Sequence, residues 1–270
     1  MSRARETGGT LPPVLALPAV VGLALLVLPL TALIARVQWD SLWADITSPQ
    51  ALDALWLSFF TGILATALCV ILGVPLALVI ARAGPRTSAV MRVLVTVPLV
   101  LPPMVGGVAL LFLFGRNGWL GMLLDEWFGM TLPFTTAAVV LAQAFVALPF
   151  LVLALEGSIR TSGVDYERTA ATLGAGRWRI LWRVTLPLAA PGLIAGIILS
   201  FARAVGEFGA TALFAGNAPG VTQTMPLAIY TAFNGGGVDQ GTAVALSLLL
   251  LVTAIAVLLL VRGWRVGAAR

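Results

Sequence analysis

The chain has 270 residues, of which 60% are apolar and 10% are charged, and its formal net charge is +5. Soluble globular chains carry about a quarter charged residues, so this composition predicts a membrane protein with several spans. The sequence has no histidine and no lysine, which excludes ATP binding through a P-loop lysine as well as histidine-based triads and zinc sites.

The single cysteine, Cys69, lies within an apolar run and has no partner for a disulfide. It is interpreted as a small buried apolar side chain. No metal site and no cofactor is predicted. No nucleic-acid partner is predicted either, because arginines on one side of a bilayer explain the basic character of the chain.

Charge-poor runs divide the chain into stretches that approach or exceed the roughly 20 helical residues needed to cross a bilayer. They predict an all-α polytopic membrane protein, with residues 1–270 forming one transmembrane domain. Six transmembrane helices are expected, at about 13–35, 54–81, 93–115, 134–155, 187–210 and 241–261. The first is interpreted as a retained span, because it is too long for a signal peptide and lacks a clear cleavage site.

The distribution of arginine predicts the orientation of these spans. With six spans, most arginines fall on one side, which the positive-inside rule makes cytoplasmic. This group consists of Arg3, Arg5, Arg82, Arg86, Arg92, the arginines from Arg160 to Arg183, Arg262, Arg265 and Arg270. Both termini are therefore expected in the cytoplasm.

The third and fifth predicted spans both open with prolines. The third contains Pro102, Pro103, Gly106 and Gly107, and the fifth begins near Pro187. Proline frees a backbone carbonyl, which a bilayer tolerates only where protein or a watery cavity satisfies it, and glycine permits close helix approach. These spans are expected to line a path through the bundle; alternatively, the prolines merely mark helix starts.

The segment 157–186, between two apolar runs, is unusually rich in charge. Ser162 and Asp165 predict a capping box, and Gly174 predicts the end of a helix of about three turns. After it, the spacing of Trp178 and Trp182 predicts a helix lying at the headgroup level. The alternative is two solvated loop helices with no partner.

Arg203 and Glu207 are the two charges expected inside the membrane, in the outer half of the fifth span. Their i, i+4 spacing allows them to pair on one helix face. Buried ionisable residues in a membrane are functional candidates, and a free arginine there would attract an anion. The alternative is a neutralising structural pair. After them, the run 208–238 is broken by Gly, Asn and Pro and is expected to form an outer loop or a re-entrant segment.

The segment 162–187 resembles the cytoplasmic EAA loop of ABC importer permeases. The resemblance rests on Thr169-Ala170, Gly174, and the distal Val184, Leu186 and Pro187, although Arg168 replaces the usual acid, which stands one position earlier as Glu167. It implies a loop, 157–186, that couples the spans to a separate ATPase. The implied coupling residues are Asp165, Glu167, Arg168, Thr169, Ala170, Gly174, Val184, Leu186 and Pro187.

The segment from Phe201 to Thr211, together with 216–230, resembles the permeases of molybdate importers, within the sulfate, molybdate and tungstate group. The resemblance implies a type I importer fold, a homodimer, two cytoplasmic ATPase subunits, an extracytoplasmic molybdate-binding protein and a bacterial inner-membrane location. The candidates for the translocation path are Pro102, Pro103, Gly106, Gly107, Arg203, Gly206, Glu207, Phe208 and Gly209.

The sequence leaves three other functions to compare with a molybdate permease. The nearest is a permease for sulfate or thiosulfate. A gradient-driven anion transporter, with Arg203 and Glu207 as a charge relay, belongs to a different class. An intramembrane enzyme has little support, because the spans contain no Ser/His, Asp/Asp or metal-binding constellation.

Overall fold

The computed structural model of the protein describes residues 13–235 and 240–267, and these residues form helices and connecting loops with no strand. In chain order the elements are η1 (Pro13–Leu15), α1 (Ala16–Ala35), α2 (Leu42–Ile46), α3 (Pro49–Arg82), α4 (Pro85–Val100), α5 (Pro103–Phe114), α6 (Trp119–Phe128), α7 (Thr136–Ser162), α8 (Asp165–Thr172), α9 (Arg177–Ile180), η2 (Leu181–Thr185), α10 (Leu186–Val205), α11 (Gly209–Phe214), α12 (Met225–Phe233) and α13 (Gln240–Gly267). The predicted all-α class is confirmed for this part of the chain. Arg3, Arg5 and Arg270, which were used for orientation, lie outside the described residues.

Four continuous helices within the described residues are long and apolar enough to cross a membrane: α1, α3, α7 and the helix from Arg177 to Val205. The pair α4 and α5 makes a fifth candidate if it is counted as one broken span. Helix α13 adds a further apolar stretch, Gln240–Ala256. By this test the described residues contain four spans, or five with the broken pair, and the sixth predicted span falls on the shorter apolar stretch of α13.

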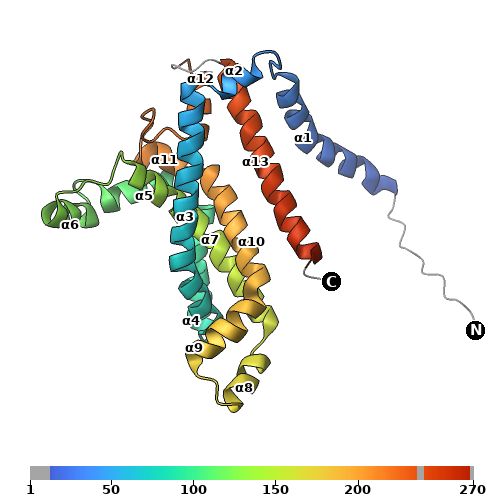
Figure 1. The fold of residues 1–270 in the computed structure, drawn as a ribbon, viewed down its shortest axis with the longest axis vertical. Helices are drawn as coiled ribbons and strands as arrows, with labels where there is room; N and C mark the ends of the chain where they lie inside the picture. The colour runs from blue at the N-terminus through green and yellow to red at the C-terminus, as the bar shows by residue number, and fades with distance from the viewer. Residues whose placement is uncertain (1–12, 236–239, 268–270) are drawn as a thin grey trace, which may run out of the picture.

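Helix α7 forms the centre of the bundle, where it packs against both α3 and α10, which also contact each other (Figure 1). Small residues allow these helices to approach closely: on α10, Gly196 lies against the backbone of Leu151 on α7. Ser200 of α10 donates a hydrogen bond to the carbonyl of Ala147 at 3.0 Å, which satisfies a buried hydroxyl across the same interface. By contrast, α1 stands away from the bundle and has no buried residue (Figure 1).

The predicted span 93–115 is not one straight helix. The chain leaves the helical conformation at Leu101 and Pro102, and α4 and α5 meet at an angle of 111°. The two successive prolines are the physical cause, because proline lacks an amide donor and disfavours a helical conformation in the residue before it. Pro103 is the first residue of α5, so at this position the prolines do mark a helix start.

The segment after Gly176 differs from the expected headgroup helix, because α9, η2 and α10 form one continuous helix from Arg177 to Val205. Its unusual feature is η2, a π-helical turn of five residues in which the amide of Leu186 bonds to the carbonyl of Leu181. The ring of Pro187 clashes with a regular i−4 carbonyl, which gives a physical reason for the wider turn just before it. Pro187 therefore does not begin a separate helix.

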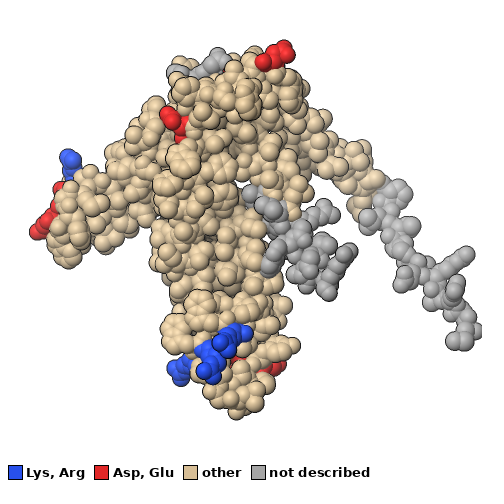
Figure 2. Space-filling model, in the orientation of Figure 1, with Lys and Arg blue, Asp and Glu red and all other residues tan. Residues whose placement is uncertain are grey.

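The described part of the run 208–238, which ends at Gly235, forms no single span, in agreement with the expectation. It contains the short helices α11 and α12: α11 packs against α5 and α7, and α12 packs against α13 and α3. Both lie at the end of the bundle opposite α8 (Figure 1). On the face drawn in Figure 2, arginines gather at the α8 end, whereas the uncovered middle of the bundle shows no charged side chain. This banding is the pattern expected of a bilayer-spanning bundle.

Candidate functional site

Helix α8 is a short helix of eight residues at the exposed end of the bundle. The predicted capping box is wrong: Ser162 ends α7 and bonds to the carbonyl of Ser158, and the residue that caps α8 is Val164. The predicted end at Gly174 is confirmed. Gly174 has φ +81°, its amide bonds to Ala171, and the amide of Ala175 bonds to Ala170, which is a Schellman motif.

The side chains of α8 divide between two faces. Asp165 and Arg168 point into solvent and lie 3.8 Å apart, and the side chain of Leu173, just after the helix, is 83% exposed. Glu167 turns the other way, because its carboxylate forms an ion pair with Arg82 of α3 and accepts a hydrogen bond from Thr185 of η2 at 2.7 Å. The two acids of this helix therefore have different surroundings.

The remaining residues of the EAA-like pattern support the turn or lie on the following helix. The hydroxyl of Thr169 donates to the carbonyl of Asp165 at 2.9 Å, and Ala170 provides a carbonyl to the Schellman turn. The distal residues Val184, Leu186 and Pro187 lie at the junction of η2 and α10. The two halves of the motif thus lie on either side of a helix–loop–helix turn formed by α8, the loop after it and α9 with η2, which is called the α8 corner below.

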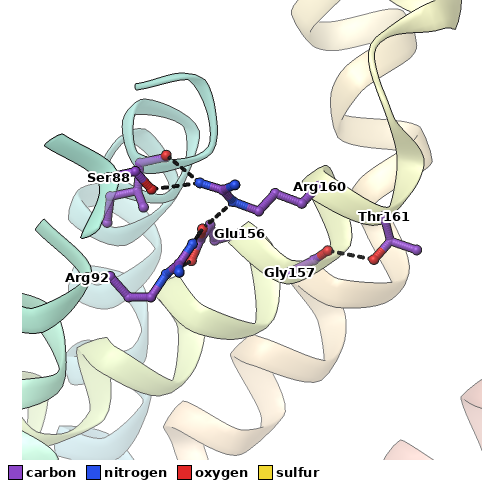
Figure 3. A network of polar contacts seen from close by, with 7 residues as sticks. Ser88, Arg92, Glu156, Gly157, Arg160 and Thr161 are labelled. Atoms are coloured by element: carbon purple, nitrogen blue, oxygen red, sulfur yellow. Dashed lines mark hydrogen bonds and ion pairs between the residues drawn. The ribbon is translucent and has the colours of Figure 1, made fainter. Parts of the chain in front are cut away.

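A buried carboxylate near the α8 corner was missed by sequence reasoning. Glu156 of α7 accepts hydrogen bonds from Arg92 of α4, at 2.5 and 3.2 Å, and from Arg160, at 2.6 Å (Figure 3). Arg160 also donates to the hydroxyl of Ser88 at 2.6 Å and to the carbonyl of Ile80 at 3.3 Å. The signal in the sequence was the i, i+4 spacing of Glu156 and Arg160 at the end of an apolar run, which by itself says nothing about Arg92.

Arg203 and Glu207 pair at the other end of α10, with 2.5 Å between the guanidinium nitrogen and the carboxylate oxygen. Glu207 is 1% exposed and also accepts the amide of Ala210 at 2.8 Å, whereas the side chain of Arg203 is 28% exposed. A buried carboxylate needs such partners, because an unpaired charge is costly in a low-dielectric interior. The exposed part of the pair is therefore the cationic one.

Two of the four glycines proposed for the path, Gly107 and Gly209, lie at a close contact between α5 and α11, whereas Gly106 faces the ring of Phe145 on α7. A Cβ atom added to Gly107 would lie 2.8 Å from the carbonyl oxygen of Ala210, and one added to Gly209 would lie 2.8 Å from Pro103. Pro102 stays exposed at the bend. Beyond α10, Gly206 is exposed and the ring of Phe208 contacts that of Tyr230 at 4.9 Å between centroids.

The family of binding-protein-dependent transport system inner membrane components matches residues 70–265. The chain belongs to this family. The permease is 53% identical to the molybdenum transport system permease protein ModB of Mycobacterium tuberculosis, over 90% of each chain. It is 40% identical to ModB of Escherichia coli, covering 73% of this chain and 86% of that one. It is also 33% identical to the sulfate transport system permease protein CysT of Escherichia coli, covering 82% and 80%.

The permease has the fold of ABC importer permeases. Its structure matches a chain of a bacterial ABC transporter that imports the acidic polysaccharide alginate, with a TM-score of 0.67, 16% identity and 93% coverage of both chains. It also matches a chain of the MetNI methionine ABC transporter, with a TM-score of 0.57 and 18% identity, covering 78% of the permease and 94% of that chain. Another structure of the alginate transporter contains a periplasmic protein with bound alginate pentasaccharide.

Proposed function

We propose that the permease is the membrane-spanning subunit of an ATP-driven importer that moves molybdate into the bacterial cytoplasm. The observation that carries the proposal is the 53% identity to a molybdenum permease over 90% of both chains. A sulfate permease is more distant, at 33% identity, and sulfate or thiosulfate is the second candidate substrate. Tungstate, an oxyanion of similar shape, is proposed as an additional cargo.

The proposed topology has six spans in the inner membrane. They are α1, α3, the broken pair α4–α5, α7, the continuous helix from Arg177 to Val205, and α13. Following the ribbon, the start of α1 and the end of α13 point toward the side of the molecule on which α8 lies (Figure 1). The arginines on that side agree with the positive-inside rule, which makes it cytoplasmic and assigns both termini there.

The energy for transport comes from a separate ATPase, because the lysine-free sequence offers no P-loop. In the proposed complex, two copies of the permease bind two ATPase subunits, and an extracytoplasmic binding protein delivers molybdate. Helix α8 is proposed to insert in a cleft of the ATPase through its exposed Asp165 and Arg168 and through Leu173, which directly follows it. Closure of that cleft would then rock the spans between two states as rigid bodies.

The proposed path runs past the outer end of α10, where the partly exposed Arg203 provides a cation for the oxyanion. Glu207 holds that guanidinium in place, and its negative charge lowers the net charge of the pair that the oxyanion meets. The attraction would therefore be weak enough for release, as conduction requires. The close contact of α5 with α11 would position the wall of the path.

Reconstitution tests the proposal directly. Proteoliposomes that contain the permease, its ATPase and the binding protein should take up labelled molybdate only when ATP is supplied on the side of the membrane that carries the ATPase. Competition with tungstate and with sulfate ranks the substrates, and preferential uptake of sulfate would select the second candidate. Uptake that continues without the ATPase and stops with a protonophore would instead indicate a gradient-driven transporter.

A further inference from the structure

The carboxylate of Glu167 joins α8 to two other elements, the nearby η2 and the end of α3, which is distant in sequence. One of its oxygens, Oε1, pairs with Arg82, the last residue of α3, and accepts the hydroxyl of Thr185 in η2 at 2.7 Å. Its side chain is 12% exposed, compared with 92% for Asp165 and 76% for Arg168 on the same helix. Glu167 therefore faces the bundle, while its neighbours face outward.

Helix α8 packs against α9 and η2. The ion pair with Arg82 adds α3, a long helix of the central bundle, to these contacts. A guanidinium is a permanent cation, and a charge-assisted hydrogen bond is stronger than a neutral one and, unlike apolar packing, directional. A displacement of α8 along its own axis would thus pull on the end of α3 as well as on η2.

The contact with η2 falls on an irregular turn. Thr185 is buried and is the last residue of the π-helical segment. A π turn contains one residue more than the α-helical turn it replaces, and each residue of an α-helix turns by about 100°. If η2 became α-helical, Thr185 would rotate by about that angle relative to α8 and would leave Glu167. The hydrogen bond therefore links the position of α8 to the helical state of η2.

The α3–α4 hairpin is held from a second side by the network around Glu156. Arg160 of α7 bonds to Ser88 at the start of α4 and to the carbonyl of Ile80 near the end of α3, and Glu156 bonds to Arg92 of α4 (Figure 3). The hairpin and α7 are thereby joined near their shared end. Because α4 leads directly to the bend before α5, movement of the hairpin reaches the broken helix.

From these contacts we propose that Glu167 is a positioning residue that fastens α8 to α3 and to η2, rather than a contact to the ATPase. Through these two contacts, a movement of α8 caused by the ATPase is transmitted both to the α3–α4 hairpin and to η2 at the start of α10. The inference rests on the proposed function, since it assigns a role within the same coupling step.

The test compares Glu167→Gln with Arg168→Gln in the complete complex of permease, ATPase and binding protein. Two quantities are measured: retention of the ATPase on an affinity column through the permease, and molybdate transported per ATP hydrolysed in proteoliposomes. Glu167→Gln should keep the ATPase bound while transport per ATP falls by about two- to fivefold, the range expected for a partly exposed ion pair. Arg168→Gln should weaken retention instead, and Arg116→Gln, far from the α8 corner, serves as the matched control.

A charge swap separates positioning from a general loss of folding. Arg82→Glu combined with Glu167→Arg should recover most of the lost transport per ATP, whereas each single reversal should not. Loss of ATPase retention in Glu167→Gln to the same extent as in Arg168→Gln would overturn the inference, as would unchanged transport per ATP. A wild-type complex that transports no molybdate with ATP would overturn the proposed function itself, which is a distinguishable result.

Discussion

Two adjacent glycines on α5 allow a sharp test of how closely α5 must approach α11. Gly106 and Gly107 are both buried, but the space around them differs. A Cβ atom at Gly107 would meet backbone atoms of Ala210 at 2.8 and 3.0 Å and the Cβ of Leu213 at 3.0 Å. One at Gly106 would meet the ring of Phe145 at 3.0 Å, and that ring can rotate away.

The expected effects follow from these neighbours. Alanine is favoured over glycine inside a helix by about 1 kcal/mol, and both variants gain this amount. Overpacking against fixed atoms costs about 1–3 kcal/mol, and this cost falls on Gly107→Ala because a backbone carbonyl cannot move independently. Gly106→Ala should therefore be neutral or slightly stabilising, and Gly107→Ala should be the less stable of the two by about 1–3 kcal/mol.

Thermal unfolding of the purified variants in one detergent measures this difference. At about 2–4 °C for each kcal/mol in a large domain, the midpoints should differ by several degrees, with Gly107→Ala lower. Uptake of molybdate in proteoliposomes should follow the same order, because α5 carries proposed path residues. Equal midpoints for the two variants would refute the close packing of α5 against α11.

Three further predictions concern the α8 corner and the two buried carboxylates. Gly174→Val should lower transport per ATP hydrolysed, because a β-branched residue disfavours φ +81°, whereas Gly157→Val inside α7, with no atom near its added Cβ, should not. Arg203→Gln leaves Glu207 buried without its cation, which should lower the free energy of unfolding by about 3–5 kcal/mol. The double variant that adds Glu207→Gln should regain thermal stability without regaining uptake. Recovery of both stability and uptake would show that the pair is purely structural. Glu156→Gln should increase protease cleavage at the α3–α4 turn in detergent, and an unchanged cleavage rate would show that packing alone holds the hairpin.

Much of the architecture could be predicted from composition and local signals. Apolar runs located the long helices because crossing a bilayer requires about 20 residues without charge. Gly174 was identified as a helix end because a left-handed residue is a local requirement that glycine meets. The run 208–238 was recognised as broken because its glycines, asparagines and prolines act on the backbone where they stand.

Other local signals were outweighed by contacts at a distance. Ser162 and Asp165 have the spacing of a capping box, yet Ser162 is the last residue of α7, and one turn earlier the hydroxyl of Ser158 ties this helix to the carbonyl of Ala189 on α10. Pro187 predicts a helix start, but the wider π turn before it accommodates its ring within a continuous helix. Pro102 and Pro103 predicted a distortion without its size, since the angle of 111° depends on where α5 packs against α11.

The sequence by itself determined that this protein is an apolar helical bundle with one charged corner and no ATP-binding lysine, because these properties follow from residue types and their local spacing. Only the tertiary structure decided which charges are partners. Glu167 meets Arg82 across 85 positions of sequence and Glu156 meets Arg92 across 64. Such pairings arise from the packing of α3, α4 and α7, and no local pattern specifies which distant guanidinium a carboxylate will face.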